Sequence, residues 1–146
     1  MNEMGDEQGE QAALRQAMES GHHEAAPPSA LLLGLALQRQ GDVAVAGDAF
    51  KRAIDSGHRQ AAPQAALKMA ALLAGQGDMN GARAACQVAI NSGHADAAPR
   101  AAVILGILRA TQGDVPGARA AYQYAVDSGH EEAAQQAADH LREMGR

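Results

Sequence analysis

Four histidines are the residues of this chain whose type and spacing could do chemistry. They lie in four copies of nearly one segment: "SGHHEAAP" from Ser20, "SGHRQAAP" from Ser56, "SGHADAAP" from Ser92 and "SGHEEAAQ" from Ser128. Imidazole is a common zinc ligand and a common general base, so a returning histidine raises both possibilities. The copies begin 36 residues apart each time, and a fixed period of this length is typical of stacked repeats.

The regular period argues against a metal or catalytic site at His22, His58, His94 and His130. Equivalent residues of stacked helix pairs are expected roughly 10 Å apart, given a helix packing distance of about 8–10 Å. Zinc ligands lie about 2.1 Å from one ion, which this spacing forbids for neighbouring copies. We interpret each histidine as part of a helix-ending signal, in which the imidazole follows a terminal glycine and meets the last carbonyls of the preceding helix. Only His22 and His23 leave room for a chance surface site, and we predict no metal and no cofactor.

Each 36-residue copy predicts two helices and two turns. The first helix has apolar residues at 30, 33, 34 and 37, the stripe of an amphipathic helix, and it ends at the glycine of "QGD". The aspartate of "QGD" is expected to cap the second helix, which ends at the glycine of "SGH". These turn residues are Gly41 and Asp42, Gly77 and Asp78, and Gly113 and Asp114. A hairpin of this kind does not bury its own apolar face, so the copies are expected to stack.

The repeat pattern predicts a single all-α domain over residues 1–146. It consists of a half-repeat at 5–19, full repeats at 20–55, 56–91 and 92–127, and a terminal half-repeat at 128–146. The last helix, from about Glu131 to Met144, is rich in glutamine and charged residues. Such polarity suits a terminal cap that is exposed to water.

The chain resembles tetratricopeptide-type repeat proteins over essentially its whole length, with some Sel-one-like features. The resemblance rests on these residues: "LG" at 33–34 and 105–106, with "MA" at 69–70 departing; Ala46, Ala82 and Ala118; Phe50 and Tyr122, with Cys86 between them; Ala53, Ala89 and Ala125; and the "GH" followed by alanines. The copies are two residues longer than the usual repeat of about 34. Ala30, Ala66 and Ala102 replace the aromatic residue that commonly opens the first helix. The resemblance implies a right-handed α-solenoid whose first helices line a concave face.

Composition excludes several other function classes. With one Phe, two Tyr, no Trp and a net charge of −5, the chain lacks the basic patches and aromatic platforms of nucleic-acid-binding proteins. The apolar run "LLLGLAL" at 31–37 is too short to span a membrane, and the acidic start does not resemble a signal peptide. Cys86, the single cysteine, is interpreted as a small core residue and fits a reducing cytoplasm. The excess of alanine, and of arginine over lysine, suggests a bacterial source.

No nucleophile, base and orienting group converge in the sequence, so we predict that the chain is not an enzyme. We expect a scaffold or adaptor that binds a peptide or helix of a partner protein in a groove of the first helices. The predicted groove residues are Leu31, Leu35, Gln38, Arg39, Leu67, Lys68, Ala71, Arg100, Val103 and Ile107. The apolar members among them could instead pack one first helix on the next. Two further alternatives stay open, namely self-assembly through the terminal half-repeats, head-to-tail or as a dimer, and a place as one domain of a larger protein.

Overall fold

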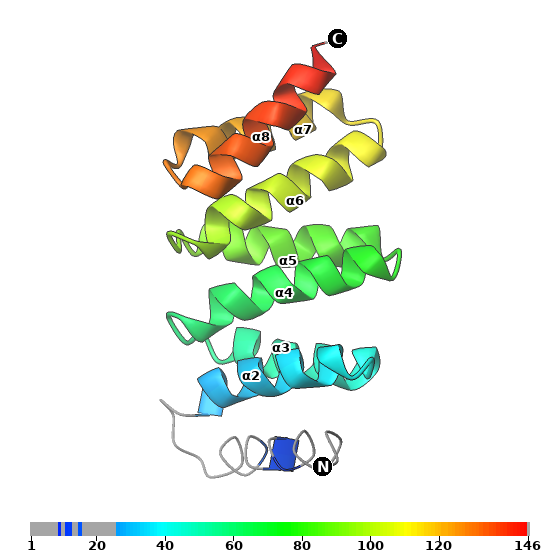
Figure 1. Ribbon diagram of the computed structural model, residues 1–146, viewed down its shortest axis with the longest axis vertical. Helices are drawn as coiled ribbons and strands as arrows, with labels where there is room; N and C mark the ends of the chain where they lie inside the picture. The colour runs from blue at the N-terminus through cyan, green and yellow to red at the C-terminus, as the bar shows by residue number, and fades with distance from the viewer. Residues whose placement is uncertain (1–8, 10, 13–14, 16–25, 146) are drawn as a thin grey trace, which may run out of the picture. The chain divides into compact units, whose positions relative to one another are not determined.

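The computed structural model describes residues 9, 11, 12, 15 and 26–145. Most of the predicted N-terminal half-repeat 5–19, and His22 and His23 after it, lie outside the described residues. Within residues 26–145 the chain is all-α, with seven helices and no strand (Figure 1). The helices are α2 (Ala26–Arg39), α3 (Val43–Asp55), α4 (Ala61–Gly75), α5 (Met79–Asn91), α6 (Ala97–Thr111), α7 (Val115–Asp127) and α8 (Glu131–Met144).

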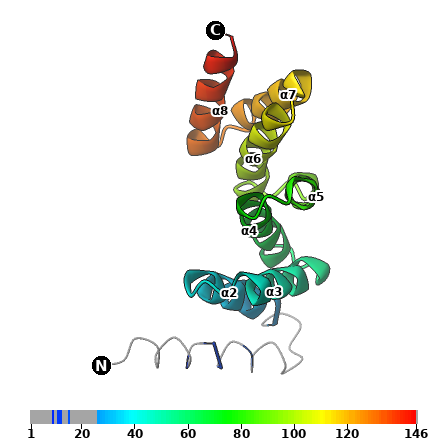
Figure 2. The same cartoon turned by 90° about the vertical axis from the view of Figure 1, so that its right-hand side faces the viewer.

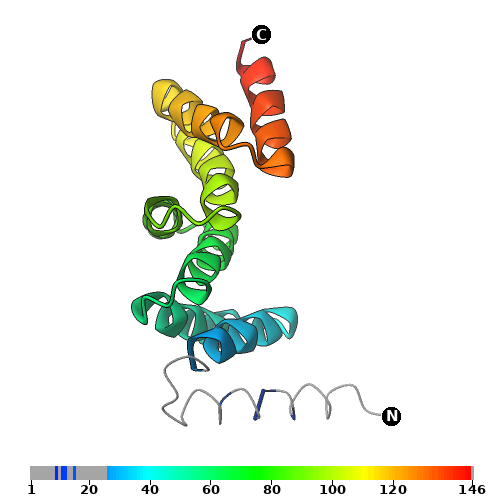
Figure 3. The ribbon, with the colours of Figure 1, turned by 90° about the vertical axis from the view of Figure 1, so that its left-hand side faces the viewer.

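Neighbouring helices pack in pairs, as expected for a helical solenoid of the tetratricopeptide type. The chain forms two compact units, residues 1–65 and 66–146. In the first unit, α2 packs against α3. In the second, α6 contacts α5 and α7, while α8 packs on α7 and also contacts α6 (Figure 2, Figure 3). The two contacts of α8 bury the alanines Ala133 and Ala137 of its inner face.

The turns between paired helices form as the "QGD" residues predict. Gly77 has a φ of 84° and Gly113 a φ of 84°, a left-handed conformation in which a side chain would be strained. The Asp78 carboxylate accepts the Gly81 amide at 2.9 Å, and the Asp114 carboxylate accepts the Gly117 amide at 2.9 Å. Two of the three predicted aspartate caps are therefore present as side-chain hydrogen bonds.

Asp42 also precedes its helix, but its side chain makes no capping hydrogen bond. The third residue after it is Val45, where the other two repeats have glycine. A Cβ atom at Gly81 would lie 2.9 Å from the carboxyl carbon of Asp78, too close for two carbon atoms. The aspartate cap thus depends on a glycine at the third helical position, and α3 lacks that glycine.

In the core, a glycine on one helix faces a bulky aromatic ring on the next helix. Phe50 is fully buried, and a Cβ atom at Gly34 would lie 2.5 Å from Cε1 of its ring. Tyr122 stands over Gly106 in the same way, with its Cδ1 at 2.6 Å from such a Cβ. In the middle repeat, Ala70 occupies the glycine position and Cys86 the ring position. The extra methyl group of alanine is thus matched by a smaller partner, which explains why this core position carries a cysteine.

Candidate functional site

His58, His94 and His130 each cap the helix that follows them, so the predicted contact of these histidines with the preceding helix is wrong. His94 Nδ1 accepts the amides of Asp96 at 3.2 Å and Ala97 at 3.0 Å, at the start of α6. His58 Nδ1 accepts the Ala61 amide at 3.1 Å. The first amides of a helix lack acceptors within it, and a neutral imidazole nitrogen supplies one. The hydroxyls of Ser56, Ser92 and Ser128 instead donate to a carbonyl of the preceding helix, as Ser92 Oγ does to the Ala89 carbonyl at 2.5 Å.

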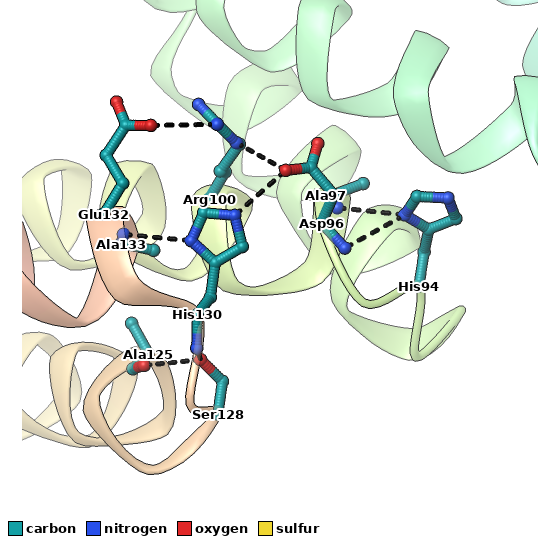
Figure 4. A network of polar contacts seen from close by, with 9 residues as sticks. All are labelled: His94, Asp96, Ala97, Arg100, Ala125, Ser128, His130, Glu132 and Ala133. Carbon is teal, nitrogen blue, oxygen red and sulfur yellow. Dashed lines mark hydrogen bonds and ion pairs between the residues drawn. The ribbon is translucent and has the colours of Figure 1, made fainter.

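His130 joins two neighbouring repeats (Figure 4). Its Nδ1 accepts the Ala133 amide at 3.1 Å, and its Nε2 lies 2.9 Å from Asp96 Oδ1. Because Nδ1 is an acceptor, the ring proton lies on Nε2 and is donated to the carboxylate. The imidazole thus caps α8 and ties it to Asp96, the residue before α6.

Arg100 completes this network. Its Nε donates to Asp96 Oδ1 at 2.9 Å and its Nη2 to Glu132 Oε2 at 3.0 Å (Figure 4). The hydrogen bond to Asp96 raises the pKa of Arg100 above its usual value, so the guanidinium stays charged. The four side chains hold each other in place at a junction between repeats. Asp96, the residue before α6, and Arg100 are four residues apart, and this spacing is the sequence signal that could have indicated the pair.

Replacement of His130 by alanine is expected to lower the free energy of unfolding by about 1–2 kcal/mol, because the Ala133 amide loses its cap and Asp96 loses a donor. His130→Asn keeps a side-chain acceptor at the cap position and is expected to recover part of the loss. Urea unfolding followed by circular dichroism measures both, with the exposed Gln136→Ala as control. Equal stability of wild type and His130→Ala would contradict the cap.

Neither metal binding nor thiol chemistry has a site among the residues that the structure describes. There, no three His, Cys, Asp or Glu side chains are grouped so that they could hold a metal ion. Cys86 is fully buried, and burial raises the pKa of its thiol to about 12 against the opposing attraction of Arg109. The thiol therefore stays protonated at neutral pH and inaccessible to reagents. Its position agrees with the interpretation as a core residue.

The predicted groove residues differ in exposure. Leu31, Leu35, Gln38 and Arg100 are half-buried, and Arg39, Lys68, Ala71 and Ile107 are exposed. Leu67 and Val103 are only 6% and 5% exposed. Val103 belongs to the apolar cluster formed with Tyr122, Ala133 and Ala137. Leu67 and Val103 are thus packing residues within this chain, and the accessible surface lies on the other eight.

Two hollows open on the second unit. One, of about 350 Å³, lies between the loop after α5, the first turn of α6 and the last turns of α7. The other, of about 570 Å³, lies along the first turns of α8, and His130, Glu131, Glu132, Gln135 and Gln136 line it. All of its lining comes from α8 and the residue before it. The sequence pattern indicated neither hollow.

The sequence matches the family model described as "Tetratricopeptide repeat-like domain" over residues 2–143. The chain belongs to this family. Tetratricopeptide-like repeats are generally non-enzymatic scaffolds for protein–protein interaction. No protein of curated function matches the sequence.

A tetratricopeptide-like structure that this chain is similar to is that of the "MamA RS-1 ArsTM double mutant". The TM-score is 0.59 at 18% sequence identity, and the match covers 93% of this chain and 90% of that one. At this identity the similarity shows the fold. No helix among the described residues of the tetratricopeptide-like chain is both long and apolar enough to cross a membrane.

Proposed function

We propose that this tetratricopeptide-like chain is a non-enzymatic scaffold or adaptor that binds a peptide or a short helix of a partner protein. The binding surface is the concave face formed by the first helices of the repeats. The partner is a protein, with no nucleic acid and no membrane involved, and the chain acts in a bacterial cytoplasm. The low aromatic content, the net charge of −5 and the buried single thiol support this assignment.

The observation that carries the proposal is the exposure of Ile107 on a helix that is otherwise largely buried. Nine residues of α6 between Ala97 and Leu108 are buried, whereas Ile107 is 42% exposed. A large aliphatic side chain left in water on a core helix is a candidate contact for a partner. In the first unit, Leu35 of α2 is half-buried at the equivalent position of its repeat.

The proposal is tested with the double variant Leu35→Glu, Ile107→Glu. Charged side chains at these positions are expected to reduce recovery of the partner about tenfold or more in affinity purification, because a buried unpaired carboxylate opposes apolar contact. Val115→Glu is the matched control, since Val115 is 44% exposed and lies outside the predicted groove. Unchanged recovery by the double variant, with its helical circular dichroism intact, would rule out the groove.

Self-assembly through the terminal half-repeats has less support at the C-terminal end. Arg142 occupies the repeat position of Gly34 and Gly106, where a following helix would insert its ring. The Arg142 side chain is exposed and forms an ion pair with Asp139. A further repeat would have to displace this pair, so we assign α8 as a cap. Light scattering over a concentration series separates the two functions, because a strict monomer would exclude self-assembly.

A further inference from the structure

The hollow of about 350 Å³ is built from three consecutive segments of the second unit. Gly93, His94 and Ala95 come from the loop after α5, Ala98 and Pro99 from the first turn of α6, and Tyr124, Asp127 and Ser128 from the end of α7. Its volume lies within the range of about 300–1,000 Å³ that is typical of ligand pockets. The hollow shares no residue with the predicted groove.

The lining favours a positive charge. Asp127 is the only carboxylate among the lining residues, and no lysine or arginine lines the hollow. Asp127 lies at the C-terminal end of α7, where the helix dipole also favours cations. Its Oδ1 accepts a hydrogen bond from Gln123 Nε2 at 2.8 Å, which fixes the carboxylate at the rim.

Tyr124 adds an aromatic surface to this acidic site. Its side chain is 42% exposed although it is one of only three Phe and Tyr residues in the chain. The other two, Phe50 and Tyr122, are buried in the core. An exposed aromatic ring next to a carboxylate is the combination that binds a guanidinium group, by cation–π contact on the ring and hydrogen bonds to the carboxylate.

The preceding repeat places different residues at the three positions that give this hollow its chemistry. Where the hollow has Ala95, Tyr124 and Asp127, the preceding repeat has Arg59, Val88 and Asn91, respectively. The glycine, histidine, alanine, proline and serine of the lining are the same in both copies. Of these two copies, only the one at 92–128 has an aromatic ring, a carboxylate and no basic residue at the three positions.

We propose that this hollow binds the guanidinium group of an arginine that a partner protein presents. The group stacks on the Tyr124 ring and donates hydrogen bonds to the Asp127 carboxylate. Ala95, in place of the arginine of the preceding repeat, leaves the space open and removes a competing positive charge. The hollow and the predicted groove share no residue. A negative result for arginine binding in the hollow would therefore not affect the groove proposal, and a negative result for the groove would not affect the hollow.

Nuclear magnetic resonance titration of the full chain tests the site with Nα-acetyl-argininamide as the probe. Nα-acetyl-citrullinamide is the matched control ligand, since it has nearly the same shape and no charge. The arginine probe is expected to shift the ring resonances of Tyr124 and the amides of Ala95 and Ser128, with saturable binding. The citrulline probe is expected to bind at least tenfold more weakly. Equal shifts with both probes, or no shifts at these residues, would overturn the proposal.

The double variant Tyr124→Val, Asp127→Asn installs the residues of the preceding repeat, so the helix is expected to remain folded. It should bind the arginine probe about tenfold more weakly or not at all, because both the aromatic face and the carboxylate are lost. Glu143→Gln also removes one negative charge, but from α8, and should bind as the wild type does. Equal affinity of the double variant and the wild type would refute the assignment of Tyr124 and Asp127.

Discussion

Gly106→Ala is expected to lower the free energy of unfolding by about 1–3 kcal/mol, although alanine is the better helix former. The new Cβ would lie 2.6 Å from Cδ1 of Tyr122, and a ring held in a close-packed core has little room to move away. Tyr122 is only 2% exposed, and its ring is stacked on His140 with centroids 5.0 Å apart. The steric cost therefore exceeds the gain in helix propensity of up to about 1 kcal/mol.

The middle repeat shows how the clash can be relieved, because it combines Ala70 with Cys86. Tyr122→Cys alone should cost about 3 kcal/mol through the cavity it leaves. The double variant Gly106→Ala, Tyr122→Cys should cost about 1–2 kcal/mol less than the sum of the two single variants. The stacking on His140 is lost in both variants that lack the tyrosine, so it cancels from the coupling energy.

Chemical denaturation of the four proteins measures this coupling. Ala110→Gly, at an exposed position of the same helix, is the control for the effect of helix propensity alone. Additive costs of the two core substitutions would show that the ring and the glycine do not depend on each other. A Gly106→Ala protein more stable than wild type would contradict the close packing itself.

Phe50→Ala is expected to be the most destabilising single substitution in the first unit, at about 3–5 kcal/mol. Phe50 is fully buried, and its ring fills the space left by Gly34. Alanine would leave a cavity, since α2 offers no side chain at Gly34 to occupy it. Thermal unfolding followed by circular dichroism measures the loss.

Arg52→Ala on the same helix serves as the control for Phe50→Ala. Arg52 is exposed, and exposed substitutions usually change stability by about 0.5 kcal/mol or less. A loss at Phe50 no larger than that at Arg52 would disprove the assignment of this ring to the core.

The helix pairs and their turns were predictable because they depend on local chemistry. Within residues 26–145, the glycines of "QGD" and "SGH" have positive φ angles as expected, from 69° at Gly57 to 84° at Gly77. A left-handed residue is required where a helix ends and the chain reverses, and glycine adopts it without strain. The missing hydrogen bond of Asp42 also has a local cause in Val45, which could have been read from the aligned copies.

The role of the histidines was not predictable in the same way. A residue between two helices can reach the last carbonyls of one or the first amides of the next, and the sequence order is identical in both cases. In the structure the His130 imidazole accepts an amide of the following helix. It also contacts Asp96, which is 34 residues away in the sequence. A contact over that distance depends on the stacking of repeats.

The sequence alone determined an all-α repeat protein of the tetratricopeptide type, with the places of its turns, because a constant period and turn glycines act through the local backbone. Only the tertiary structure decided which apolar residues remain exposed. The apolar periodicity places Val103 and Ile107 on α6 but does not indicate which of them a neighbouring helix covers. In the structure α8 contacts α6, and Val103 is buried. The hollow beside Tyr124 and Asp127 likewise depends on three segments meeting in space. Burial and cavities are properties of packed neighbours, and packing is fixed only when the whole chain is folded.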